Sequence, residues 1–156
     1  MAIWTLLRAR GTLHGDFLQV DETMTKEEAF ARLARSPFRS RFKLDASDRV
    51  YIARVGRETL ARHAADFVRT KLSAAEPVND GQQTPMRGHP IFKAMHATAM
   101  CCRGCMAKWW KVVPHQPLTD EQQQKVVEML LAWVDRQLAQ PVPLKKANPA
   151  RNANEK

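Results

Sequence analysis

Residues 88–110 read GHPIFKAMHATAMCCRGCMAKWW, and this stretch holds every cysteine of the chain, Cys101, Cys102 and Cys105. It also holds His89 and His96, two of the five histidines. Thiolate sulfur and imidazole nitrogen suit zinc first and iron second. We therefore predict a metal site in this stretch, with zinc as the expected ion and iron as the alternative.

The spacing of these residues predicts which of them bind the ion. Cys102 and Cys105 form a CxxC pair, whose sulfurs can reach one tetrahedral ion at a turn or a helix start. We expect Cys102, Cys105 and His96 as ligands, with Cys101 or His89 as the fourth. Because a helix rises about 1.5 Å per residue, His89 and His96 cannot both bind one ion from a single straight helix.

Other interpretations of the cysteines stay open. Cys102 and Cys105, with Arg103 between them at a helix start, are typical of a reactive thiol pair. Free cysteines are also common as small buried apolar residues. An iron–sulfur cluster usually needs a fourth cysteine, which the chain lacks. His63, on the apolar side of another expected helix, is a reserve metal ligand.

Helix signals surround this stretch on its N-terminal side. Thr25 and Glu28 form a capping box at the start of a first helix, which should end before Pro37. A basic loop is expected after that proline. A second helix, capped by Asp45 or Ser47, should end at Gly56, and a third should follow over residues 57–72.

Residues 73–89 are rich in turn signals and predict a long central loop. Pro90 is expected at the first position of the next helix, with His89 as its cap. Thr119 begins another capping box and the last helix, which Pro141 terminates. These patterns predict a mostly α-helical single domain of five or six helices with a Cys/His metal site. Residues 4–7 and 17–20 have the composition of short strands.

Composition divides the chain into three parts. We expect residues 1–24 to be a leader or short N-terminal extension and residues 25–140 to be the helical Cys/His domain. Residues 141–156 are rich in Pro, Asn, Ala and Lys and predict a disordered basic tail.

The net charge of +9, from 25 Lys and Arg against 16 Asp and Glu, favours nucleic acid or another polyanion as a partner. A protein partner is the alternative. No run approaches the ~20 apolar residues of a membrane span, and three crowded cysteines fit a reducing cytoplasm. The candidate phosphate-binding residues are Arg39, Arg41, Lys43, Arg87, Lys108 and Lys111.

Three blocks of sequence carry a family resemblance. They are RSRFKL at residues 39–44, NDGQQTPMRGHP at residues 79–90 and HATAMCCRGCMAKW at residues 96–109. With them the chain resembles an uncharacterised bacterial family, domain of unknown function 4186, over roughly residues 28–137. The family carries no assigned activity, so the resemblance implies domain boundaries and little else. Trp110 stands where the family is expected to have a histidine, which argues against a universal ligand there.

These patterns lead to one main functional hypothesis and two alternatives. The main hypothesis is a zinc-binding helical module that contacts nucleic acid or a protein partner. The first alternative is a metal-dependent hydrolase with an open zinc position and Asp80, His89 or Glu76 as general base. The second is a CxxC thiol redox protein. The sequence does not decide whether the protein is an enzyme.

Overall fold

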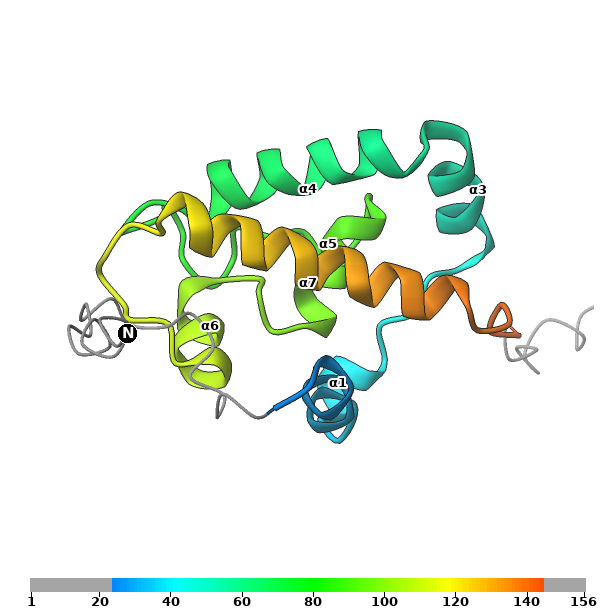
Figure 1. Ribbon diagram of the computed structural model, residues 1–156, viewed down its shortest axis with the longest axis horizontal. Helices are drawn as coiled ribbons and strands as arrows, with labels where there is room; N and C mark the ends of the chain where they lie inside the picture. Colours follow the sequence, from blue (N-terminus) through cyan, green and yellow to red (C-terminus); the bar gives the residue numbers. More distant parts are fainter. Residues whose placement is uncertain (1–23, 145–156) are drawn as a thin grey trace, which may run out of the picture.

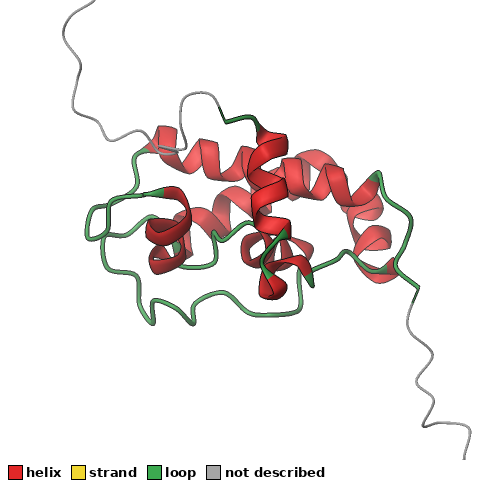
Figure 2. Cartoon of the chain, turned by 90° about the horizontal axis from the view of Figure 1, so that it is seen from below, coloured by secondary structure: helices red, strands yellow, loops and turns green. Residues whose placement is uncertain are grey.

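The computed structural model describes residues 24–144, which form seven α-helices and no strand (Figures 1 and 2). The helical fold class predicted from the sequence is therefore confirmed. The predicted leader, apart from Met24, the possible strands at residues 4–7 and 17–20, and tail residues 145–156 lie outside the described residues. The helices are α1 (Lys26–Ala34), α2 (Pro37–Ser40), α3 (Ala46–Val55), α4 (Arg57–Lys71), α5 (Pro90–Ala97), α6 (Arg103–Trp110) and α7 (Asp120–Leu138).

Side-chain caps set where several helices begin. The Thr25 hydroxyl accepts a hydrogen bond from the Glu28 N–H at 3.2 Å, and the Glu28 carboxylate accepts one from the Thr25 N–H at 2.7 Å. Thr119 and Gln122 form the same reciprocal pair at the start of α7. Both capping boxes predicted from the sequence are therefore confirmed. Each one satisfies backbone N–H groups that have no partner within the helix.

The short helix α2 replaces the first part of the expected basic loop. The Ser36 hydroxyl accepts a hydrogen bond from the Arg39 N–H at 3.3 Å, and Pro37 occupies the first turn. A proline just inside a helix start is favourable because its fixed backbone angle suits that position. The same Ser-Pro pair therefore ends α1 and starts α2, and this places Arg39 on a buried helical turn.

Gly56 separates α3 from α4. Its φ of 81° lies in a region that residues with a side chain rarely adopt, so the glycine allows a sharp change of direction between two helices. The predicted end of the second helix and the start of the third at Arg57 are confirmed.

Helix α7 lies against α4 and α5 and provides the centre of the core (Figure 1). Val126, Leu130 and Val134, on its inner face, are at most 1% exposed. Residues from α4 and α5 complete this core, and burying each large apolar side chain contributes about 1.5–3 kcal/mol. The packing fixes α5 and thus the chain that leaves it toward the cysteines. The most deeply buried residues of α4 and α5 are Leu60, Ala64, Val68, Ile91, Ala94 and Met95.

The long segment between α4 and α5 is held by one buried arginine. One guanidinium nitrogen of Arg103 donates to the carbonyl oxygens of Leu72 at 3.3 Å and Ala74 at 2.8 Å. The other donates to those of Val113 at 3.0 Å and Gln116 at 2.7 Å. Arg103 therefore joins the start of this segment to the connection between α6 and α7.

Candidate metal centre

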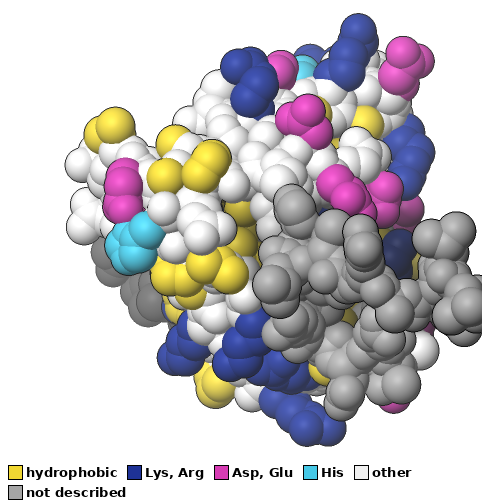
Figure 3. Space-filling model, turned by 60° about the vertical axis from the view of Figure 1, so that its left-hand side comes forward, with side chains coloured by type: hydrophobic (Ala, Val, Ile, Leu, Met, Phe, Trp, Pro, Cys, Tyr) yellow, Lys and Arg dark blue, Asp and Glu magenta, His cyan; other side chains and the backbone are white. Residues whose placement is uncertain are grey.

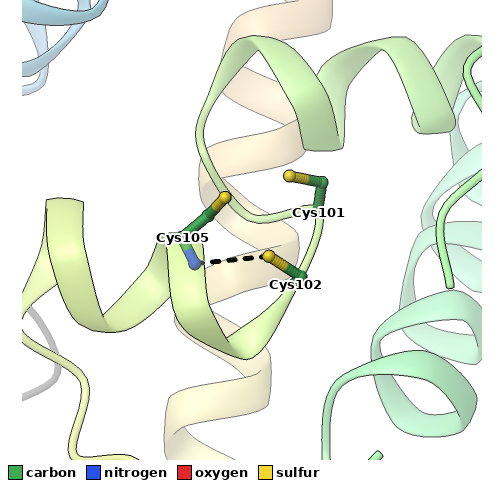
Figure 4. A group of neighbouring side chains, drawn as sticks. All are labelled: Cys101, Cys102 and Cys105. Atoms are coloured by element: carbon green, nitrogen blue, oxygen red, sulfur yellow. Dashed lines mark hydrogen bonds between the residues drawn. The ribbon is translucent and has the colours of Figure 1, made fainter. Parts of the chain in front are cut away.

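The three cysteines meet at the junction of α5 and α6 (Figure 4). Cys101 precedes α6, Cys102 caps its N-terminus and Cys105 lies in its first turn. The Cys102 sulfur accepts a hydrogen bond from the Cys105 N–H at 3.3 Å. All three sulfur atoms lie within 4.8 Å of one another, so the group could hold a metal ion.

The spacing of the sulfurs fits a tetrahedral ion. With Zn–S bonds of about 2.3 Å, tetrahedral geometry separates two sulfurs by roughly 3.8 Å. The sulfurs therefore need only small side-chain adjustments to share one ion. Cys101 and Cys102 are buried and Cys105 is partly buried, which shields such an ion from water.

Arg39 is the charged partner of this cluster. Its guanidinium donates to the Cys105 sulfur at 3.2 Å and to the His96 carbonyl oxygen at 2.6 Å, with a longer contact of 3.8 Å to the Cys101 sulfur. Hydrogen bonds with Cys101 and Cys102, followed by the bond and charge of Arg39, lower the pKa of Cys105 far below its usual 9.0. Hydrogen bonding with the neighbouring thiols, together with burial, raises the pKa of Cys101. The surroundings of Cys105 thus favour its thiolate, which is the form that binds a metal ion.

His96 lies beside this group in a state suited to a metal ligand. Its Nε2–H donates to the carbonyl oxygens of Thr84 at 3.1 Å and Pro85 at 3.2 Å, and its ring stacks on Phe42. Burial lowers the pKa of His96, which favours the neutral ring. Its Nδ1 is buried and has no hydrogen-bond partner among the described residues. The imidazole therefore carries a free lone pair on Nδ1.

The structure brings together only part of the predicted ligand set. Cys101, Cys102 and Cys105 form the group, whereas His96 and His89 are not within its 4.8 Å limit. His89 caps α5 instead, and its Nδ1 accepts the Ile91 N–H at 3.0 Å. The reserve ligand His63 lies beside His89, with 3.1 Å between ring nitrogens, and not in the cysteine group.

The two carboxylates named as possible general bases lie in different places. Asp80 is beside the cysteine cluster at the start of α6, where it accepts hydrogen bonds from the Arg103 N–H at 2.9 Å and from the Gln83 side chain at 2.8 Å. Glu76 pairs with His115 on the surface. Of these two carboxylates, only Asp80 is near the sulfur atoms.

The candidate phosphate-binding residues separate into three groups. Arg39 is buried against the sulfurs, which corrects the expectation that it contacts phosphate. Arg41, Lys43 and Arg87 are exposed around one pocket. Lys108 and Lys111 are exposed at the C-terminal end of α6.

Sequence reasoning missed the buried roles of Arg39 and Arg103. Arg39 belongs to a run of basic residues, a pattern that predicts an exposed side chain. The only signal of a different environment is its position in the short helix that begins after Ser36. Arg103 was interpreted as an activator of the neighbouring thiols, but its guanidinium bonds four carbonyl oxygens. Nothing in its sequence surroundings signals that network.

A family model for the domain of unknown function DUF4186 matches residues 27–135. The chain belongs to the DUF4186 family. The matched range covers all seven helices except the ends of α1 and α7, and it includes the complete cysteine cluster. No solved structure matches the chain. Among the described helices, none has the length and apolar character that crossing a bilayer requires.

Trp110, where the resemblance led us to expect a family histidine, is part of the core in this DUF4186 member. It is 3% exposed, and its indole N–H donates to the Thr98 carbonyl oxygen at 2.7 Å. The bond ties the end of α6 to the chain leaving α5, so both sides of the cysteine cluster are fixed.

Proposed function

We propose that this DUF4186 member is a zinc-binding helical module in which Cys101, Cys102, Cys105 and Nδ1 of His96 bind one zinc ion. The convergence of the three sulfurs carries the proposal. His96 is the preferred fourth ligand because a zinc-bound histidine usually donates its other ring N–H to a carbonyl or carboxylate oxygen. Its Nε2–H bonds to two carbonyl oxygens are of this kind. The imidazole moves toward the sulfurs as the ion binds.

Four protein ligands make the proposed site closed and structural. Structural zinc is almost always bound by four protein ligands, whereas catalytic zinc keeps a position for water. The ion would fix the turn between α5 and α6. Arg39 would not bind the ion itself but would donate a hydrogen bond to its ligand, the Cys105 sulfur. Zinc is favoured over iron because the set combines thiolates with an imidazole and lacks a fourth cysteine.

Elemental analysis of protein purified without a metal-affinity column tests this proposal. We expect one zinc per chain in the wild type, loss of zinc in Cys102→Ser, and weaker zinc binding in His96→Gln. His115→Asn is the matched control, because His115 is exposed, pairs with Glu76 and is not part of the described sulfur group. If the wild-type protein contains no metal, the proposal is wrong. If His96→Gln binds zinc with unchanged affinity, His96 is not a ligand.

We further propose that the module contacts nucleic acid, since exposed cations at the end of α1 and on α6 lie around one hollow. Arg32, Arg35 and Lys108 surround a hollow of about 450 Å³ beside Trp109. Figure 3 shows Lys and Arg side chains gathered on the lower part of one face, which corresponds to the α1 and α6 end in Figure 1. Exposed Lys and Arg side chains bind the phosphates of a nucleic acid, because binding releases the counterions condensed on it. Lys111, at the end of α6, adds to the same charge.

Fluorescence anisotropy with a labelled single-stranded oligonucleotide tests this contact. We expect binding that weakens as a power of the salt concentration, with a shallower slope in Lys108→Gln, because each phosphate contact contributes to that slope. Lys125→Gln, which removes an exposed charge on α7, should leave binding nearly unchanged. Absence of binding at low salt would leave a protein partner as the better explanation of the basic surface.

The contact between Arg39 and Cys105 favours thiol redox chemistry as a second candidate function. A cysteine with a lowered pKa, partly exposed and beside two other thiols, has the features of a reactive thiol. On this alternative, added oxidised glutathione accepts two electrons and two protons from two thiols of the metal-free protein, which form a disulfide, and added dithiothreitol reverses the step. Cys105 is then the first residue that iodoacetamide alkylates in the reduced protein. If tightly bound zinc protects all three thiols from alkylation, thiol redox chemistry is excluded.

A further inference from the structure

A second polar site lies between the α2–α3 connection, α3 and the start of α5, away from the cysteine ligands. It is an open pocket of about 630 Å³. Small-molecule sites typically measure 300–1,000 Å³, so the pocket has room for a compact organic ligand. Its walls come from segments distant in sequence, namely residues 41–51 and 86–93.

Three cations at this pocket have no carboxylate partner. Arg41, Lys43 and Arg87 are exposed, and among the described residues none of them makes an ion pair or a side-chain hydrogen bond. Arg41 lies over the Phe38 ring, 4.4 Å from its centroid, so its side chain has an apolar support. The charge on this side of the pocket is therefore free for an anionic ligand.

The fourth cation, Lys93, is neutralised within the protein. It is paired with Asp48 and, at 3.2 Å, with Asp45. Although burial alone would lower the pKa of Lys93, the hydrogen bonds and charges of the two carboxylates raise it. Lys93 offsets one of these two carboxylate charges, and the four cations of the pocket still outnumber its two carboxylates by two.

Tyr51 and His89, which both line the pocket, form a hydrogen-bonded group with His63. The Tyr51 hydroxyl lies 3.2 Å from His63 Nδ1 and 3.3 Å from His89 Nε2. Because His89 Nδ1 accepts the Ile91 N–H, a neutral His89 carries its proton on Nε2. That nitrogen therefore acts as a donor toward Tyr51 or His63, and it has no lone pair for a metal ion.

The pocket consequently offers two kinds of contact to one ligand. The free cations suit an anion with several oxygen acceptors, since charge-assisted hydrogen bonds are the strong ones. Tyr51 and Met86 line the pocket beside them and offer ring and apolar surface to an organic body. A phosphate attached to an organic group meets both requirements, whereas inorganic phosphate meets only the first.

We propose that this pocket binds a phosphate monoester, with Arg41, Lys43 and Arg87 on the phosphate and Tyr51 against the organic group. The site shares no residue with the proposed zinc ligands or with the basic surface at α1 and α6, although Phe42, which lines it, stacks on His96. A free nucleotide and the 5′-phosphate end of a nucleic acid carry the same chemistry.

Isothermal titration of the zinc-loaded full chain at low salt tests the proposal, with 5′-AMP, adenosine and pyrophosphate as probes. We expect 5′-AMP to bind and adenosine to bind at least about tenfold more weakly, because adenosine lacks the charged acceptors. Arg87→Gln should weaken 5′-AMP by about tenfold. Arg62→Gln is the matched control, since Arg62 is exposed on α4 and bonds only to Thr59.

Two oligonucleotides of one sequence, with and without a 5′-phosphate, distinguish the source of the ligand. Tighter binding of the phosphorylated strand that depends on Arg87 assigns the site to a nucleic-acid end, and 5′-AMP binding without that preference assigns it to a free nucleotide. The proposal is overturned if 5′-AMP fails to bind at millimolar concentration, whether or not pyrophosphate binds. It is equally overturned if adenosine matches 5′-AMP, or if Arg87→Gln leaves 5′-AMP affinity unchanged. Zinc content, measured on the same samples, keeps this result separate from the metal proposal.

Discussion

Two buried arginines carry much of the local order around the cysteines. Arg39 is 7% exposed and Arg103 is 4% exposed, although arginine is rarely buried without partners. The Arg39 guanidinium bonds to sulfur and to the carbonyl oxygen of His96, whereas among the described residues the Arg103 guanidinium bonds to carbonyl oxygens only. The first arginine therefore acts on the metal centre, and the second acts on the framework that surrounds it.

Replacing Arg39 should weaken zinc binding without displacing the ligands. Arg39→Gln removes the donors to Cys105 and His96, and loss of such an outer contact typically lowers metal affinity by about 10–100-fold. Competition with a chromophoric chelator measures the change. Arg41→Gln, which alters an exposed neighbour, should keep wild-type affinity, and equal affinities in all three proteins would argue against a role for Arg39.

Replacing Arg103 should destabilise the fold instead. Arg103→Gln leaves several buried carbonyl oxygens without a donor, and we expect a loss of about 3 kcal/mol or more in the free energy of unfolding. Urea denaturation measures it. Arg57→Gln breaks an exposed pair with Asp135 and should cost less than about 1 kcal/mol. Similar losses for both variants would contradict the assigned network.

These residues also show where sequence reasoning ends. The cysteine cluster was predictable because all three cysteines lie within five residues, a separation that one turn can close. The position of Arg39 depends on packing between α2, which ends at Ser40, and α5, which begins only at Pro90. No local pattern encodes such a contact.

At the scale of elements, helix starts are where sequence and structure agree best. Thr25 and Thr119 cap helices as predicted, because their hydroxyl groups accept hydrogen bonds from backbone N–H groups that have no partner in the first turn. The short helix α2 was not predicted, because a Ser-Pro pair such as Ser36-Pro37 is equally typical of the end of one helix and of the start of another. Local chemistry therefore determines where helices begin, and tertiary packing decides whether a short one persists.

The cap of α5 should make stability depend on pH. Burial, followed by the charge of His63, lowers the pKa of His89 from 6.5 to about 4, against a smaller opposing effect of Asp48. The unfolded chain then binds more protons between these values, so stability is full above pH 6.5 and falls as the pH drops toward 4. The loss from this group is at most about 3 kcal/mol, since one pKa unit corresponds to ~1.4 kcal/mol.

Thermal unfolding of the wild type and His89→Asn across this range checks the dependence. Asparagine also caps helices, so the variant should fold while losing the titration of this residue. We expect its melting temperature to fall less steeply than that of the wild type between pH 6.5 and pH 4. Parallel curves would show that His89 does not cause the dependence.

For the whole molecule, we expect the metal centre and the helix packing to make different contributions to stability. Helices α4, α5 and α7 contact one another directly, whereas Cys101 and Cys102, which belong to the same core, lie on the turn from α5 to α6. We expect chelator-treated protein to keep its helical circular dichroism but to melt at a lower temperature, because zinc stabilises only the folded state. Complete loss of helix on metal removal would contradict this division.

X-ray absorption at the zinc edge of the purified protein tests the central claim most directly. The proposed ligands predict three sulfur neighbours at about 2.3 Å and one nitrogen neighbour at about 2.0 Å. In His96→Gln the nitrogen should be lost while the three sulfurs remain. A wild-type spectrum with two or fewer sulfurs, or with only oxygen and nitrogen neighbours, would contradict a zinc centre built from Cys101, Cys102 and Cys105.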